Sequence, residues 1–127
     1  MLSRDSTSDS AELVVLSLLG DRRLYGYAIG KEVAARSDGK LRLTPGVLYP
    51  LLKELEAQGL ISSSWEEIKA EDADADDVGR RRKWYRLTAK GRRRLEQRVA
   101  AHRAFRTIID AFIGRAPHAA GGEGAER

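Results

Sequence analysis

Four consecutive cationic residues, at positions 80–83, form the densest group of like charges in the sequence. An acidic segment precedes them: residues 66–77 hold seven carboxylates and one lysine, a local charge of −6, whereas residues 80–98 carry +9. Neighbouring cations repel one another in a folded chain, and a polyanion relieves this repulsion. The pattern favours a nucleic-acid-binding segment, with a solvated surface balanced by the adjacent carboxylates as the alternative.

Side chains that serve in catalysis or metal binding are sparse. The chain has no cysteine, and neither His102 nor His118 has a second ligand at metal-binding spacing. The carboxylates of residues 71–77 resemble a hard-cation loop in density but lack the glycine and terminal glutamate of an EF-hand. We expect that segment to be a solvated tip that discourages non-specific DNA contact. Without a glycine-rich phosphate loop or a nucleophile beside a base, the sequence predicts no enzyme, metal site or cofactor.

The segment that begins at Thr44 has the strongest helix signals. Thr44 followed by Pro45 is typical of a helix start, and Gln58-Gly59 is a typical end. The apolar positions recur at helical spacing and predict a buried face made of Val47, Leu48, Leu51, Leu52 and Leu55. The opposite face is expected to carry Gly46, Tyr49, Lys53 and Gln58. This pattern fits a recognition helix that enters the major groove, and it fits an ordinary exposed helix face equally well.

Other segments supply the frame that positions this helix. Residues 10–19 are apolar at most positions and predict a buried helix, and residues 27–37 predict a second helix with a narrow apolar stripe. Residues 60–67 and 83–87 predict two antiparallel strands. A loop of about 15 residues joins the strands, which is long for a hairpin. Residues 1–9 and 116–127 are expected to be flexible tails.

A long helix is predicted over residues 89–113, with Thr88 as its cap. Its seam is close to a heptad repeat and consists of Leu95, Val99, His102, Phe105, Ile109 and Phe112. The seam extends beyond what the core of so small a domain needs, so a second copy of the chain is its expected cover. We therefore predict a mainly α fold with a small β-hairpin: a winged helix-turn-helix domain over residues 10–88 and a dimerisation helix over residues 89–115.

The hydropathy pattern predicts in which cellular compartment the protein resides. The longest apolar run, residues 13–19, is interrupted by Ser17 and is far shorter than the ~20 residues that span a bilayer. The N-terminus lacks the apolar core of a signal peptide. With the absence of cysteine, this predicts a cytoplasmic protein without membrane contact.

Several motifs resemble the PadR family of bacterial regulators, and the resemblance covers about residues 11–112. The motifs are Leu24-Tyr25-Gly26-Tyr27, residues 41–52 with Thr44-Pro45-Gly46 and Tyr49-Pro50, residues 55–61 with Leu55-Glu56 and Gly59-Leu60, residues 82–88, and Gly91. Residues 82–88 read Arg-Lys-Trp-Tyr-Arg-Leu-Thr. The short C-terminal region is similar to that of family members with a single C-terminal helix.

The resemblance implies a dimeric repressor whose recognition helices enter successive major grooves of a near-palindromic operator. It implies operator contacts at Tyr25, Thr44, Gly46, Tyr49 and Lys53, with Arg82 and Lys83 from the wing. It also implies that a small hydrophobic or aromatic effector releases some members from DNA.

Two features depart from the family pattern. The acidic wing is longer and more negative than expected, which weighs against contact between the wing and DNA. The last helix contains no tryptophan, which weighs against a pocket of stacked indoles there. Trp65 and Trp84 are expected to pack against the helices, with ligand contact as the alternative.

Three other functions stay open: a protein-interaction module, a ligand sensor without DNA activity and an RNA-binding winged helix.

Overall fold

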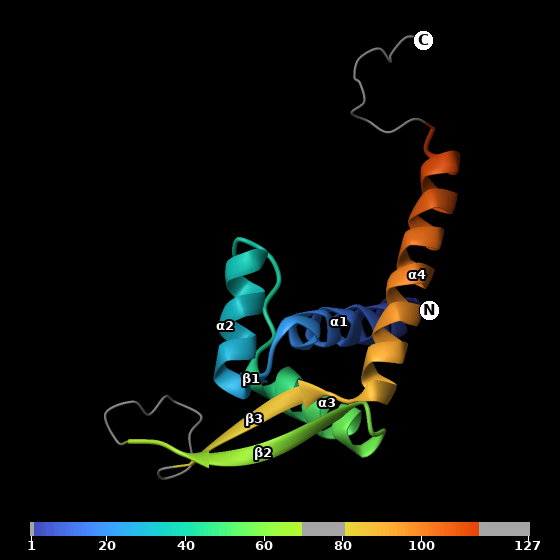
Figure 1. Ribbon diagram of the computed structural model, residues 1–127. Coiled ribbons are helices and arrows are strands. Elements are labelled where there is room, and N and C mark those ends of the chain that lie inside the picture. The colour runs from blue at the N-terminus through green and yellow to red at the C-terminus, as the bar shows by residue number, and fades with distance from the viewer. Residues whose placement is uncertain (1, 70–80, 115–127) are drawn as a thin grey trace. The chain divides into compact units, whose positions relative to one another are not determined.

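The structure is a computed structural model that describes residues 2–69 and 81–114, and for residues 2–9 only the path of the helix (Figure 1). The acidic residues 71–77, Arg80, His118 and the predicted tail over residues 116–127 lie outside the described residues. The elements follow one another as α1 (Leu2–Asp21), β1 (Leu24–Tyr25), α2 (Gly26–Arg36), α3 (Pro45–Ala57), β2 (Ile61–Glu67), β3 (Arg81–Leu87) and α4 (Ala89–Phe112).

The first helix is longer than the sequence predicts. α1 begins at Leu2 rather than near Ser10, so it includes residues expected to form a flexible tail. No glycine or proline precedes Gly20 in this segment, so no residue there interrupts the helix. Helix propagation is favourable once a turn has formed, and the buried part of α1 supplies that turn.

The core lies between α1, α2, α3 and one face of the small sheet (Figure 1). Leu16 of α1, Ile29 of α2 and Leu52 and Leu55 of α3 are fully buried there. Leu60, Ile61 and Tyr85 close the core from the sheet side. The predicted second and third helices and the predicted hairpin are thereby confirmed, within one or two residues at most of their ends.

The hairpin is extended by a third strand that the sequence did not predict. The sheet order is β1-β3-β2, and both pairs are antiparallel. β1 is only two residues long, with Leu24 opposite Tyr85 and Tyr25 opposite Trp84. Two residues are too few to show the alternation that identifies a strand, so this segment was expected to be a turn.

Alternation along the strands divides the sheet into two faces. The inner face, which points toward the core and α3, carries Leu24, Ile61, Ser63, Trp65, Glu67, Arg81, Lys83, Tyr85 and Leu87. The outer face carries Tyr25, Ser62, Ser64, Glu66, Arg82, Trp84 and Arg86. Arg82 and Lys83 therefore lie on opposite faces of β3.

Hydrogen bonds join the end of α3 to the start of α4, a region that we call the α3–α4 junction (residues 58–60 and 88–91). Gly59 has a φ of 77°, which turns the chain after α3. The Thr88 hydroxyl donates to the Gly59 carbonyl at 2.6 Å and accepts from the Gly91 amide at 2.9 Å, so the predicted cap is confirmed. Lys90 Nζ donates to the Gln58 carbonyl at 2.8 Å.

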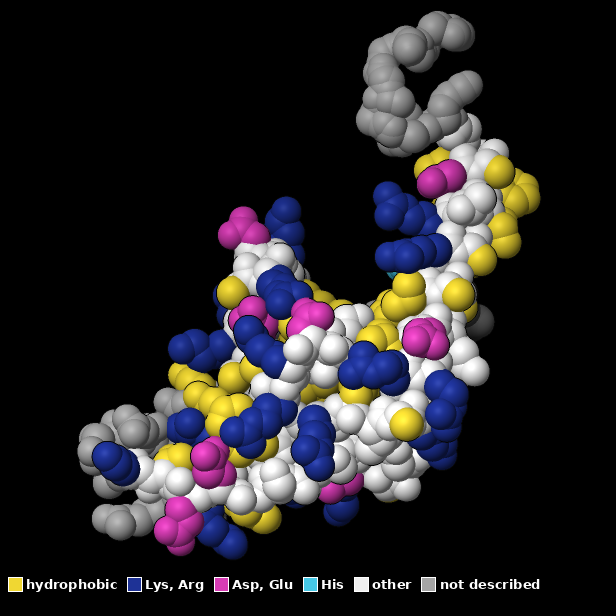
Figure 2. All heavy atoms as spheres, viewed as in Figure 1, with side chains coloured by type: hydrophobic (Ala, Val, Ile, Leu, Met, Phe, Trp, Pro, Cys, Tyr) yellow, Lys and Arg dark blue, Asp and Glu magenta, His cyan; other side chains and the backbone are white. Residues whose placement is uncertain are grey.

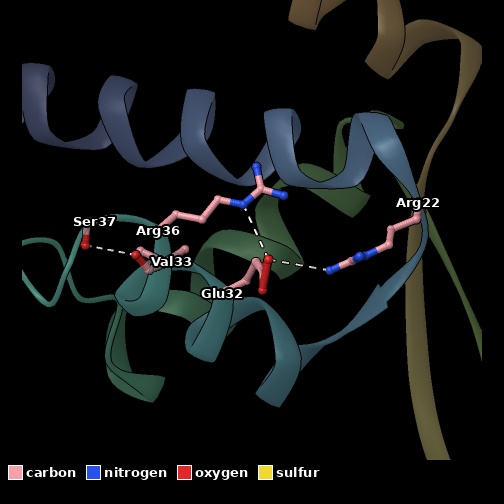
Figure 3. A network of polar contacts seen from close by, with 5 residues as sticks. All are labelled: Arg22, Glu32, Val33, Arg36 and Ser37. Carbon is pink, nitrogen blue, oxygen red and sulfur yellow. Dashed lines mark hydrogen bonds and ion pairs between the residues drawn. The ribbon is translucent and has the colours of Figure 1, made fainter.

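Polar contacts hold the helices in place around this core. Glu32 of α2 receives the guanidinium groups of Arg22 and Arg36 at 3.6 and 3.4 Å, as Figure 3 shows. Arg94, in the second turn of α4, forms an ion pair of 3.1 Å with Glu12 of α1, whose side chain is only 11% exposed. The second contact links the first and last helices of the domain.

The chain divides into two compact units, residues 1–95 and residues 96–127. Leu95 belongs to the first unit and packs against its core. In the part of the chain that the structure describes, no helix is long and apolar enough to cross a membrane.

Candidate nucleic-acid interface

The solvent side of α3 is the first candidate surface. Its exposed residues are Thr44, Pro45, Gly46, Val47, Pro50, Lys53, Glu54 and Ala57. The Thr44 carbonyl accepts hydrogen bonds from the Val47 and Leu48 amides at 2.9 and 2.7 Å, while its side chain makes no capping bond. Three of the predicted DNA contacts, Thr44, Gly46 and Lys53, are thus exposed. Thr44 and Gly46 lie at the positive end of the helix dipole, and Lys53 lies about two turns farther along α3.

Two side chains of α3 do not lie where the sequence predicts. Val47, expected in the core, is 51% exposed. Tyr49, expected on the open face, is half-buried and packs against the core. A Cβ at Gly26 would lie only 2.5 Å from the Tyr49 hydroxyl oxygen, so the ring occupies space that the glycine of α2 leaves open. Both residues lie on flanks of the buried stripe, and the neighbouring helix determines which flank is covered.

Replacing Tyr49 with alanine is therefore expected to lower the free energy of unfolding by about 2 kcal/mol, because the ring fills part of the core margin. Tyr49→Phe keeps the ring and should retain most of this stability. Urea denaturation measures the difference. Lys53→Ala, at an exposed position of the same helix, serves as the control. A Tyr49→Ala protein as stable as the wild type would contradict the packing role.

On the inner face of the sheet, the β2–β3 hairpin continues past the core alongside α3. Ser63 of β2 donates to Glu56 of α3 at 2.6 Å, and Lys83 Nζ lies 3.9 Å from the same carboxylate. Trp65, opposite Lys83, is 46% exposed. The Arg81 guanidinium lies 4.4 Å from the centre of its ring and Lys83 Nζ 5.7 Å. The hairpin therefore presents an indole and two cations on the same side as α3.

The outer face holds a separate cluster of two aromatic rings and two guanidinium groups. Arg23 lies 4.1 Å above the Trp84 ring, and Arg82 lies 4.0 Å above the Tyr25 ring. The two rings meet edge to face at 5.0 Å. Trp84 Nε1 donates a hydrogen bond to Glu66, and these residues line a groove of about 580 Å³.

The structure therefore distributes the predicted contacts over three surfaces. Tyr25 and Arg82 meet on the outer face, Lys83 lies on the inner face, and the remaining exposed ones are on α3. The expectation that both tryptophans pack against helices was wrong. Trp65 contacts Arg81 and Lys83 instead, and Trp84 contacts Tyr25 and Arg23.

Strand pairing also changes the meaning of the charge pattern. The antiparallel register places Glu66 opposite Arg82 and Glu67 opposite Arg81. Glu66 additionally lies 3.9 Å from Arg23. The ends of the acidic and basic segments thus face each other across the hairpin, and the charge separation seen along the sequence is partly cancelled in space.

The C-terminal half of α4 and Ile113, the residue that follows it, expose the apolar residues that the seam predicts in this part of the chain, and two more. Phe105, Ile108, Ile109, Phe112 and Ile113 are all exposed, and their spacing puts them on one side of the helix. We call this set the α4 apolar face; Figure 2 shows hydrophobic side chains along this part of α4. His102 is also exposed, Val99 is half-buried, and Leu95 packs against the core of its own unit.

Within the described ranges, no three His, Cys, Asp or Glu side chains come together as a metal-binding group would require. The acidic residues 71–77, the only segment considered for a cation, are not among those residues.

Comparisons with known proteins agree with this architecture. The family model of the transcriptional regulator PadR-like family matches residues 15–97. A transcriptional regulator of Mycobacterium tuberculosis is 29% identical over 118 residues, which are 93% of this chain and 96% of that protein. The crystal structure of a PadR family transcription regulator from Clostridium difficile is 29% identical, with a TM-score of 0.63, over 81% of this chain and 97% of that one.

A further structure shows the fold bound to nucleic acid. Bacillus subtilis PadR in complex with operator DNA has a TM-score of 0.55 and 23% identity, over 68% of this chain and 45% of that one. The family model alone matches more than half of this chain, and the predicted winged helix-turn-helix with a C-terminal helix is confirmed. The protein belongs to the PadR-like family of transcriptional regulators.

Proposed function

We propose that this regulator is a dimeric repressor that binds a specific DNA operator through α3 and the β2–β3 hairpin. The exposed surface of α3 carries the proposal: Thr44, Gly46 and Lys53 lie together on it, while Leu48, Leu52 and Leu55 anchor the opposite side in the core. A helix anchored in this way can enter the major groove without losing its position. The operator complex of Bacillus subtilis PadR supports DNA as the partner.

The α4 apolar face supports the dimer. Five large apolar side chains on one side of a helix form a patch that water solvates poorly. A second copy of the same helix offers a matching apolar stripe, and a two-fold dimer then presents two α3 helices to a near-palindromic operator.

Because the proposed operator is chromosomal DNA, we also propose that the protein acts in the cytoplasm.

The outer-face groove is the site that we propose for a small hydrophobic or aromatic effector. The groove, of about 580 Å³, is open and lined mainly by charged side chains, and Trp84 and Tyr25 supply the ring surfaces on which an aromatic effector would pack. Tyr25 and Arg82, which line it, are also predicted operator contacts. An effector bound there would engage both residues and so compete with DNA, which gives a route to the relief of repression.

Fluorescence anisotropy tests the proposal directly. The protein is titrated onto labelled duplex from the region upstream of its own coding sequence and onto a scrambled duplex, each at two salt concentrations. An operator-specific repressor prefers the first by about 10³-fold or more. Equal and steeply salt-dependent binding to both would leave only non-specific DNA binding. Binding to neither duplex would contradict the proposal and favour the protein-interaction module.

Lys53→Ala is expected to weaken operator binding by about tenfold, the loss that one direct contact typically produces. The exposed position predicts little change in stability. Arg103→Ala is the control, because it removes the same charge from an exposed position of α4 that is assigned to no interface. If the two variants bind the operator equally well, the assignment of α3 as the recognition helix is wrong.

A further inference from the structure

We propose that Trp65 is a DNA contact of the wing: its indole packs on a deoxyribose of the operator backbone, and Arg81 and Lys83 bind the adjoining phosphates. The inference rests on the proposed function and deepens it, because it assigns to DNA the inner face of the hairpin and a residue outside the predicted set of contacts.

The first argument is the exposure of the indole. Trp65 shows 46% of its surface to solvent, although it lies in the middle of a regular antiparallel pair. The other tryptophan is arranged differently: Trp84 Nε1 donates to Glu66, and its ring contacts Arg23 and Tyr25. The Trp65 indole is therefore available to a partner, and tryptophan is a residue type that is enriched at interfaces.

The second argument is its position relative to α3. Ser63, two residues before Trp65 on the same face, donates to Glu56 of α3. Lys83, directly opposite Trp65, reaches the same carboxylate. These contacts hold the inner face of the hairpin and α3 on one side of the domain. A duplex seated on α3 would therefore meet this face of the hairpin as it leaves the core.

The third argument is the chemistry of the cluster. The Arg81 and Lys83 cations both lie within 6 Å of the Trp65 ring, as the 4.4 and 5.7 Å distances show. A DNA backbone alternates apolar sugar surfaces with anionic phosphates, and an indole between two cations matches that alternation. Contacts of this kind position a protein on the duplex and carry no direct sequence information.

Two single-tryptophan proteins test the contact. Trp84→Phe leaves Trp65 as the only indole, and Trp65→Phe leaves Trp84. Acrylamide quenching of each is measured with and without a saturating mixed-sequence duplex at low salt, where anisotropy of the labelled duplex reports binding separately. We expect DNA to reduce the quenching of Trp65 by about half or more, since a contacted indole loses most of its exposed surface. Unchanged quenching of Trp65 in a protein that binds the duplex would overturn the inference.

The second measurement is the DNA affinity of proteins with substitutions at position 65. Trp65→Ala should weaken binding to this duplex by about tenfold, comparable to the loss of one aromatic contact to nucleic acid, and Trp65→Phe should recover most of it. The position is exposed, so both variants should fold, which circular dichroism verifies. A Trp65→Ala protein with wild-type affinity would also overturn the inference. Failure of the wild type itself to bind DNA would instead refute the proposed function.

Discussion

Gly91→Ala is expected to lower the free energy of unfolding by about 3 kcal/mol or more, a large fraction of the stability of a small domain. Gly91 is buried in the first turn of α4, where a Cβ would overlap the carbonyl oxygen of Leu60. That oxygen belongs to backbone, and it already accepts a hydrogen bond from the Thr88 amide at 3.1 Å, so it cannot move away cheaply. The helix start would have to separate from the α3–α4 junction.

Gly46→Ala provides the control for this substitution. Gly46 also lies in the first turn of a helix, yet no atom would come within 4 Å of an added Cβ. Alanine has a higher helix propensity than glycine, so stability should stay constant or rise by up to about 1 kcal/mol. Urea denaturation of the two variants gives the comparison. Equal stability of Gly91→Ala and wild type would show that the junction is looser than the hydrogen bonds indicate.

Ile109→Asp is expected to convert the proposed dimer into monomers and to weaken operator binding by about 100-fold or more, because linkage of two half-site contacts is lost. Ile109 lies at the centre of the α4 apolar face, between Phe105 and Phe112. A carboxylate there would have to be desolvated in an apolar interface. Light scattering measures the mass, and anisotropy measures the affinity.

Thr107→Asp introduces the same carboxylate on the opposite side of α4. The exposed Thr107 hydroxyl donates to the Arg103 carbonyl of the same helix, so its loss has little structural effect. This variant should remain a dimer and bind the operator normally. An Ile109→Asp protein that is still dimeric would place the dimer interface elsewhere on the molecule.

Much of the fold could be predicted because its signals are local. Thr44-Pro45 and Gln58-Gly59 mark both ends of α3, and the alternation of residues 61–67 identifies β2 without knowledge of distant contacts. β1 could not be predicted in this way, since its two residues form a strand only by pairing with Tyr85 and Trp84. The start of α1 could not be predicted, because the polar residues before Ser10 contain no helix breaker and so give no signal of where the helix begins.

The candidate site was harder to predict because it depends on tertiary contacts. Helical periodicity located the buried stripe of α3 but not its flanks, and Gly26 of α2 decides that Tyr49 is covered while Val47 is exposed. The charge of the hairpin depends on register, which pairs Glu66 with Arg82. Trp65 carried no distinguishing signal, since only the position of the strand relative to Glu56 shows that its face lies beside α3.

The α3–α4 junction has a consequence for how such a regulator can change over time. Thr88 and Lys90 bond the start of α4 to the residues that follow α3, so the two helices move together at that point. These bonds use none of the exposed side chains of α3 and none of the α4 apolar face. In the proposed dimer, operator recognition and subunit pairing therefore rest on separate residues, so target sequence and dimerisation are separable traits. Substitutions on α3 can redirect the protein to another promoter without altering its dimer, and substitutions on the α4 apolar face can alter the pairing without altering the proposed operator contacts.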